Sequence, residues 1–330
     1  MYSTDYWRGC RVCFGYFGLR GTKKPFIDLH LAAALEQEES TERVMSLFRG
    51  KIDNAGTMLA YQIEGSGAPV MVIGSSVYYP RTFSENFRRS YRLAYADLRH
   101  FAETSQSAGT QDITLGTYLD DIECIRRAVD FERFVLVGHS HHGNLALEYA
   151  KQHPERVSHL VLIGTPPCNV QKTIEGGERY WDTASNERKA KLDKNRASLT
   201  SEKGAFLEPE DAFVAQYVAD GPRYWYDSDY DASSLWHGVP LNMEALSAFK
   251  GFFVSYEFSW EPVRFNAPVL VVMGKYDYAV PHTLWDKALL NPQNVTYRLL
   301  DKSGHTPQLE VPEEFDQVFL EWLEKKGGAI

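Results

Sequence analysis

The sequence predicts an α/β fold built on a mostly parallel β-sheet that is flanked by helices. Three observations lead to this prediction. Short apolar runs recur along the chain, helical patterns separate them, and about one hundred residues interrupt the alternation before it resumes. Runs that are apolar throughout suit strands buried on both faces, as in a parallel sheet. Alternation of strands with helices indicates right-handed crossover connections.

The expected strands are the apolar runs. Residues 57–65, TMLAYQIEG, alternate apolar and polar side chains before a glycine, which is typical of a half-buried strand. A strand-like run, VTYRLL, occupies residues 295–300. The other runs end in glycine or a polar turn, and we predict a strand at each of 69–74, 92–98, 133–139, 159–164 and 268–274.

Helical patterns lie between these strands. In residues 117–130, Leu119, Ile122, Ile125 and Val129 recur at helical spacing. A second pattern at 144–153 ends before Pro154, because proline cannot continue a helix.

The alternation stops near Pro166 and resumes near Ala267. The intervening segment is helix-like and charged, and it holds 17 Phe, Tyr and Trp residues between 166 and 265 against 27 in the other 230 residues. We predict a core at 46–165 and 267–330, with residues 166–266 inserted as a helical cap over the carboxyl edge of the sheet, where such sheets bind ligands. The aromatic residues form a pocket lining, the insert's own core, or both.

Charge and cysteine content exclude several classes of protein. The formal net charge of −9 argues against a nucleic-acid or anionic-membrane partner. Four cysteines are too few and scattered for a disulfide framework, and the pair Cys10 and Cys13 lacks the second half of a zinc site. No apolar run approaches the roughly 20 residues that span a bilayer. We expect a cytoplasmic enzyme with a small-molecule substrate and no cofactor, and we leave a homodimer open.

Residues 1–45 stand apart from this pattern. Their first 24 residues hold five Lys or Arg and one Asp among aromatic residues, without the apolar region of a signal peptide. We expect an N-terminal extension, either poorly ordered or an added helix. A basic segment that binds a surface, and a true start at Met45, are the alternatives.

Three polar residues follow three of the predicted strands. Ser140 lies between strand 133–139 and the next helix, Asp277 follows strand 268–274, and His305 follows the run 295–300. A serine hydroxyl becomes nucleophilic when a histidine removes its proton, and that histidine needs an orienting carboxylate. The strand–turn–helix context at Ser140 and the order Ser, Asp, His favour this chemistry.

The motifs VGHSHHGN, GKYDYAVP and SGHTPQLEVPEEF, in this order, resemble those of the α/β-hydrolase superfamily over residues 46–326. GTPP at 164–167 and YADLR at 95–99 are similar to further family motifs. The likeness is to the capped branch, which includes esterases and proline iminopeptidases. It implies Ser140 as nucleophile, His305 as general base and then acid, and Asp277 as the residue that orients His305.

The resemblance also implies an oxyanion hole made by backbone N–H groups. One belongs to His141, and the other to the loop after strand 69–74, where Ser75 is the expected donor and Ser76 the next candidate. Family members usually carry His-Gly before this loop, whereas this chain has Ile73 and Gly74.

His142 departs from the family's Gly-x-Ser-x-Gly elbow, because it stands at the second glycine position and the glycine follows as Gly143. We expect His139 to pack beneath the turn and His141 to act through its backbone. Residues 139–142 straddle a tight turn, so their side chains should diverge, and we expect no metal site there.

The implied activity is cleavage of a small carboxylic ester through an acyl-enzyme on Ser140. The expected substrate pocket comprises Ser76, Tyr78, Trp181, Tyr224, Trp225 and Trp236. Serine at the elbow, in place of aspartate, weighs against epoxide hydrolase and haloalkane dehalogenase chemistry.

A proline iminopeptidase-like aminopeptidase is the main alternative. The segment 217–238 mixes aromatic residues with carboxylates that either hold a cationic amine or are solvated surface charge. These acids are Asp220, Asp227, Asp229 and Asp231, with Glu175 and Glu178 as further candidates. Carbon–carbon bond hydrolase, lactonase, acyltransferase, cofactor-free dioxygenase and non-catalytic receptor are further alternatives.

Overall fold

The computed structural model describes residues 47–104, 113–199, 207–261, 266–286, 289–290 and 292–327. The expected N-terminal extension, with Cys10 and Cys13, therefore lies outside the described residues. Among the described residues, no helix is long and apolar enough to cross a membrane.

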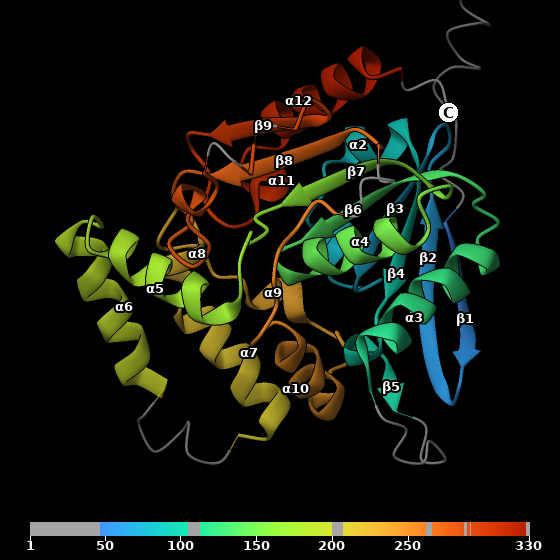
Figure 1. Cartoon of the computed structure of the whole chain (residues 1–330). Helices are drawn as coiled ribbons and strands as arrows, with labels where there is room; N and C mark the ends of the chain where they lie inside the picture. Colours follow the sequence, from blue (N-terminus) through green and yellow to red (C-terminus); the bar gives the residue numbers. More distant parts are fainter. Residues whose placement is uncertain are drawn as a thin grey trace, which may run out of the picture. The chain divides into compact units, whose positions relative to one another are not determined.

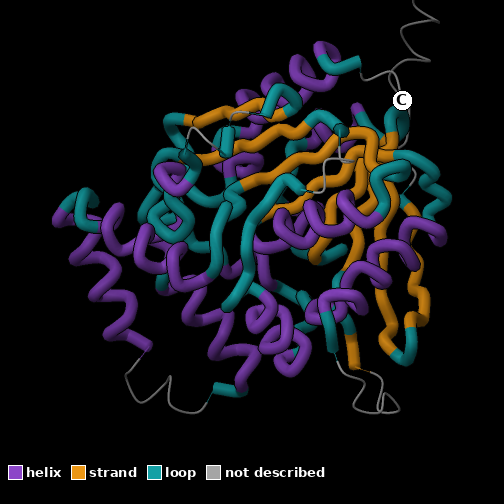
Figure 2. The backbone as a smooth tube through the Cα atoms, in the orientation of Figure 1, coloured by secondary structure: helices purple, strands orange, loops and turns teal. Residues whose placement is uncertain are grey.

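A nine-stranded sheet forms the centre of the described part of the chain (Figures 1 and 2). Its order is β1-β2-β4-β3-β6-β7-β8-β9, with β5 paired to β2. All neighbours from β4 to β9 pair in parallel, whereas β2 pairs antiparallel with β1, β4 and β5. The strands are β1 Phe48–Asn54, β2 Thr57–Glu64, β3 Pro69–Gly74, β4 Arg92–Asp97, β5 Glu103–Thr104, β6 Phe134–His139, β7 Val157–Ile163, β8 Val269–Gly274 and β9 Val295–Leu300. The predicted mostly parallel α/β fold is confirmed.

Helices cover both faces of this sheet, and each face has its own hydrophobic core. The helices are α2 Glu85–Ser90, α3 Leu115–Ala128, α4 His141–Gln152, α11 Pro307–Glu310 and α12 Pro312–Lys325. Met71 and Ile73 of β3 share a core with side chains of α3 and α4. Val70 and Val72, which point to the other face because strand side chains alternate, share a core with side chains of α2 and α12.

A helical segment separates β7 from β8 and lies beyond the carboxyl ends of the strands (Figure 1). Its helices are α5 Val170–Trp181, α6 Asn186–Leu199, α7 Pro209–Ala219, α8 Gly221–Tyr224, α9 Ser233–Trp236 and α10 Met243–Phe252. The described residues also include three short 3₁₀ helices, which are η1 Tyr79–Arg81, η2 Arg99–Phe101 and η3 His282–Leu284.

Hydrogen bonds to backbone carbonyl oxygens connect this helical segment to the part of the chain that contains the sheet. The Arg81 guanidinium of η1 donates to Leu235 O and His237 O, each at 2.7 Å. Asn242 N–H, at the start of α10, donates to His100 O of η2 at 3.0 Å. The segment is thereby held against the loops that follow β3 and β4.

Candidate active site

Ser140 lies in the sharp turn between β6 and α4. Its backbone has φ 55° and ψ −135°, a left-handed conformation that strains a residue other than glycine. Hydrogen bonds hold the turn: Ser140 N–H donates to Ile163 O at 2.8 Å, and Ser140 O accepts from Gly143 N–H at 2.9 Å. Ser140 is half-buried and lines a cavity.

Asp277 and His305 meet beyond the ends of β8 and β9. His305 Nδ1 lies 2.6 Å from Asp277 Oδ2, and both side chains are buried. The other carboxylate oxygen, Oδ1, accepts from the N–H groups of Ala279 and Val280, at 3.0 and 2.7 Å. Because Asp277 accepts, the proton of a neutral His305 sits on Nδ1, which leaves Nε2 free to act as a base.

The main chain of His305 is held on two sides. Its N–H donates to Tyr224 O of α8 at 2.5 Å. Its carbonyl accepts from Nε2 of His139, at 2.8 Å. His139 directly precedes Ser140, so the loop of His305 is anchored to the turn that carries the serine.

Glu310, at the end of α11, holds the same loop through its carboxylate. It accepts from the N–H groups of Gly304 and Thr306, each at 3.0 Å, and from Tyr226 N–H at 2.6 Å. Burial raises the pKa of Glu310, and these three hydrogen bonds oppose that rise. Sequence reasoning missed this residue, although it lies within the motif that contains His305.

The two residues predicted to supply N–H groups to an oxyanion hole follow neighbouring strands of the sheet, β6 and β3. His141 is the first residue of α4, so its N–H has no acceptor within the helix. Ser75 is buried directly after β3, the strand beside β6. The N–H of Ser76 already donates to Asp97 Oδ1 at 2.5 Å. This N–H is therefore not available to bind an oxyanion. Burial raises the pKa of Asp97 to about 7.

His142 fits at the usual glycine position because Gly74 leaves room for its side chain. A Cβ atom on Gly74 would lie 2.9 Å from His142 Nδ1 and would overlap the Tyr79 ring. The close packing of the turn is provided by Gly138 and Gly143, where a Cβ would overlap His142 O and Thr165. The side chain of His142 is buried.

His142 belongs to a chain of buried hydrogen bonds that runs from Tyr79 to α10. Tyr118 O–H donates to Ala245 O at 2.9 Å, so it accepts from His100 Nδ1–H at 3.0 Å. His100 Nε2 then accepts from His142 Nε2–H at 3.0 Å. His142 Nδ1 in turn accepts from Tyr79 O–H at 2.9 Å.

Burial keeps these imidazoles neutral. It lowers the pKa of His100 and of His139 to about 3, lowers that of His141 to about 4, and holds that of His142 well below its ordinary value. Each neutral ring has one donor and one acceptor nitrogen, so the order of partners assigns a single tautomer to His100 and to His142.

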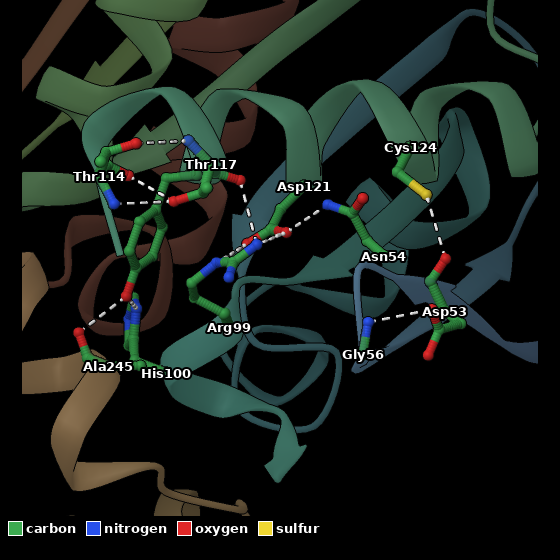
Figure 3. Close-up of polar contacts among 11 residues, drawn as sticks. Asp53, Asn54, Gly56, Arg99, His100, Thr114, Thr117, Asp121, Cys124 and Ala245 are labelled. Carbon is green, nitrogen blue, oxygen red and sulfur yellow. Dashed lines mark hydrogen bonds and ion pairs between the residues drawn. The ribbon is translucent and has the colours of Figure 1, made fainter. Parts of the chain in front are cut away.

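The buried ion pair of Arg99 and Asp121 supports η2, which carries His100. Arg99 Nε donates to Asp121 Oδ2 at 2.8 Å and Nη2 donates to Oδ1 at 2.6 Å, while Asn54 Nδ2 donates to the same Oδ1 at 2.7 Å (Figure 3). Arg99 is the last residue of the YADLR motif. Its role is therefore to tie η2 to α3.

A cavity of about 610 Å³ opens at Ser140 and His305. Of the residues predicted for the pocket, Tyr78 and Trp236 line it, and the structure brings them together with Ser140, His141 and His305. Further aromatic lining residues come from η1, η2, α7, α10 and the position directly after α10, and they are Tyr79, Phe101, Phe213, Tyr217, Phe249 and Phe253.

Four residues predicted for the pocket do not line this cavity. Trp181 packs edge-on against Tyr278, and Trp225 is buried against Tyr230. Tyr224 stacks on Tyr217, with its ring centroid 5.5 Å from that of His305. Ser76 lines a separate surface hollow beside β1 and β2.

The acidic residues considered for amine binding also lie outside the cavity lining. Asp220 pairs with Arg196 at 2.7 Å, and Glu178 pairs with Arg223 at 2.7 Å. Asp229 pairs with Lys191. Within the described ranges, no group of three or more His, Cys, Asp or Glu residues has the geometry of a metal site.

Comparison with known proteins gives consistent similarities. A family model described as alpha/beta hydrolase fold matches residues 72–312. The AB hydrolase superfamily protein YclE of Bacillus subtilis is 36% identical over 273 residues, which are 82% of this chain and 96% of that protein.

Solved structures of an esterase from Thermogutta terrifontis and of a proline iminopeptidase from Mycobacterium smegmatis share the fold. Their TM-scores are 0.58 and 0.62, at 21% and 18% sequence identity. Each comparison covers 84% of this chain and 98% of the other chain.

Proposed function

The chain belongs to the α/β-hydrolase family, and from this premise we propose that it is a serine hydrolase that cleaves a small carboxylic ester through an acyl-enzyme on Ser140. The observation that carries the proposal is the 2.6 Å contact of His305 with Asp277 beside the strained turn of Ser140. Ser140 and His305 line the same cavity. This arrangement has the parts that a nucleophilic serine requires.

The proposed reaction has two halves. His305 Nε2 takes the proton of Ser140 Oγ while Oγ attacks the ester carbonyl carbon. The N–H groups of His141 and Ser75 stabilise the negative charge on the carbonyl oxygen. The C–O bond then breaks, and the leaving alcohol takes the proton from His305. Water repeats the sequence on the acyl-enzyme and releases the carboxylic acid.

Asp277 acts on His305 in both halves. Its carboxylate keeps the Nδ1–H tautomer and stabilises the imidazolium that forms. The two backbone N–H groups that fix Asp277 Oδ1 hold the carboxylate in place for this role.

The helical segment at 166–266 acts as a cap in this proposal. Its helices α7, α9 and α10 supply Phe213, Trp236 and Phe249 to the cavity, opposite the turn of Ser140. A largely aromatic cavity suits an ester with an apolar body.

A proline iminopeptidase-like activity is the second candidate, supported by the likeness to a solved iminopeptidase. That reaction must hold a cationic amine. The described residues that line the cavity include no aspartate or glutamate, so the ester is the better match.

A fluorophosphonate probe tests for the nucleophile. We expect labelling of the wild type and of Ser90→Ala, an exposed serine on α2, and no labelling of Ser140→Ala. Folded wild-type protein that takes no label would count against a serine hydrolase. A parallel assay with p-nitrophenyl butyrate and proline naphthylamide separates the two candidates, because we expect turnover of the ester alone.

A further inference from the structure

The cavity at Ser140 is lined by side chains that are almost all uncharged. Among the described residues that line it, the histidines other than His305 are neutral because burial lowers the pKa of each. Apart from histidines, these lining residues include one ionisable basic residue, Lys250, and no acidic residue. The cavity therefore has a single fixed positive charge and no carboxylate to neutralise it.

Lys250 is an exposed residue of α10 that lines the cavity with its ammonium against an aromatic ring. Its Nζ is 4.8 Å from the ring centroid of Phe213 on α7, a cation–π contact. Lys250 is one of six lysines of the described residues for which no ion pair is found, and it is the one of these six that lines the cavity. Desolvation lowers the pKa of Lys250, and no carboxylate offsets it.

We propose that Lys250 is the anion-binding residue of this cavity and that the substrate is an ester that also carries a carboxylate. The inference rests on the proposed function. One ammonium matches a monoanion, and the described part of the lining contains no arginine, the side chain that binds phosphate through two parallel hydrogen bonds. A carboxylate at Lys250 would supply the missing counter-ion.

The arrangement also restricts the shape of the substrate. Ser247 lies three residues before Lys250 on α10 and lines the same cavity, so the two side chains share one face of the helix. Its hydroxyl can donate to the second carboxylate oxygen. Phe249 and Phe253 line the same cavity and contact the rings of His142 and His141, the residues that follow Ser140. The substrate therefore has an ester at one end, a carboxylate at the other and an apolar body between them.

Matched ester pairs test this selectivity in kcat/KM. The first pair, mono-p-nitrophenyl adipate and p-nitrophenyl hexanoate, differs by a carboxylate in the acyl half. The second pair, the acetate esters of 4-(carboxymethyl)phenol and 4-ethylphenol, differs in the alcohol half. We expect the wild type to prefer the carboxylate ester of at least one pair. Lys250→Met should lower that preference about tenfold, as expected for a hydrogen bond between charged groups.

Two variants serve as controls for this ratio. Lys250→Arg keeps the charge and should retain most of the preference. Lys325→Met removes the same charge from α12, outside the cavity, and should leave the ratio as in the wild type. A preference that stays within twofold of the wild type in Lys250→Met, for both pairs, overturns the proposal while leaving the serine hydrolase intact.

A binding measurement decides the proposal without any ester cleavage. Calorimetric titration with 4-phenylbutyrate and with 4-phenylbutan-1-ol compares a carboxylate with a neutral ligand of similar size. We expect the carboxylate to bind the wild type more tightly, and Lys250→Met to weaken it about tenfold more than the alcohol. Equal weakening of both ligands, or no binding of the carboxylate, overturns the anion site. A failure to cleave any ester overturns the proposed function instead.

Discussion

The Nε2 atoms of His142 and His100 lie 3.0 Å apart in the buried wall of the cavity. At this separation one imidazole must donate to the other, because two lone pairs would repel. The bond joins the first turn of α4 to η2, and His100 continues it through Tyr118 to α10. The histidine at the glycine position thus ties the serine-bearing turn to a helix of the 166–266 segment.

Tyr79 lies between this chain and His139, the residue that holds the loop of His305. Its hydroxyl proton is given to His142 Nδ1 at 2.9 Å, while His139 Nδ1 lies further away, at 3.3 Å. His139 carries its own proton on Nε2 and donates it to the carbonyl oxygen of His305. His139 Nδ1 and the Tyr79 oxygen then meet without a proton between them, which accounts for the longer distance.

Replacing His100 should change how stability depends on pH. Burial lowers its pKa from 6.5 to about 3 in the folded state. Between these values the unfolded chain binds a proton that the folded chain does not, so stability falls as pH falls from about 6.5. From pH 7 to pH 5 the loss is about 2 kcal/mol for this group. Urea unfolding at the two pH values should show that the unfolding free energy of His100→Gln falls by about 2 kcal/mol less than that of the wild type.

The difference between two proteins isolates His100 from other titrating groups. Asp97 has a raised pKa of about 7, so it stabilises the folded state as pH falls and acts with the opposite sign. Asp97 is present in both proteins, so its contribution to the pH dependence cancels in the difference. His237→Gln, at an exposed histidine, should show the wild-type loss. An equal loss in His100→Gln would mean that His100 is not held neutral.

Substitutions in the proposed triad should separate its members by kcat. With the best ester substrate, Ser140→Ala and His305→Ala should each lower kcat on the order of 10⁶-fold, and Asp277→Asn on the order of 10⁴-fold. The smaller effect follows because Asp277 acts through His305 and transfers no proton itself. His237→Ala controls for histidine loss at an exposed position. Near-normal turnover by His305→Ala would remove His305 from the mechanism.

Glu310→Gln should disturb His305 without touching the substrate. Three N–H groups converge on this carboxylate, whereas an amide offers one acceptor oxygen and adds a donor. We expect kcat to fall about tenfold, with a smaller change in KM and a loss of about 1–3 kcal/mol in unfolding free energy. Steady-state kinetics and urea unfolding measure the two effects. A change in KM alone would show that Glu310 does not position His305.

The strands that could be predicted are those whose sequence reports burial directly. β3, β6 and β8 are buried almost throughout, and the apolar runs predict the bounds of these strands to within one residue. β1 was not predicted, because it is an edge strand with alternate exposed residues and three charged side chains. β5 is two residues long and is defined only by its pairing with β2, which no local pattern reports.

The residues of the candidate site likewise include some that the sequence predicts and others that it does not. Ser140, Asp277 and His305 each follow a strand, so strand order predicts that they share one edge of the sheet. Of the side chains predicted from the 166–266 segment, only Trp236 lines the cavity, because which face of a helix meets the cavity depends on its packing. Trp181 and Trp225 were expected in the pocket, yet Phe249 and Lys250 of α10 line it instead. His100, directly after YADLR, was the overlooked signal within the core.

The fit of His142 against Gly74 can be measured as a coupling energy. Gly74→Ala places a Cβ atom 2.9 Å from His142 Nδ1 and against the Tyr79 ring, at a φ of 138°. We expect it to cost about 1–3 kcal/mol of unfolding free energy from crowding, with a further cost from backbone strain. His142→Gly restores the family glycine but leaves a cavity and two unpaired groups, so it should cost about 2–4 kcal/mol.

The double variant should be less destabilised than the two single variants together, because glycine at 142 removes the contact with His142 and lets the ring of Tyr79, which no longer donates to an imidazole, move away from alanine at 74. We expect urea unfolding to give a coupling of at least about 1 kcal/mol between these contacting positions. The backbone strain of alanine at a positive φ persists in both backgrounds, so the rescue is partial. Combining Gly74→Ala with His237→Gly, at an exposed position, should give additive losses. Additive losses with His142→Gly as well would show that the small residue at 74 does not explain the histidine at 142.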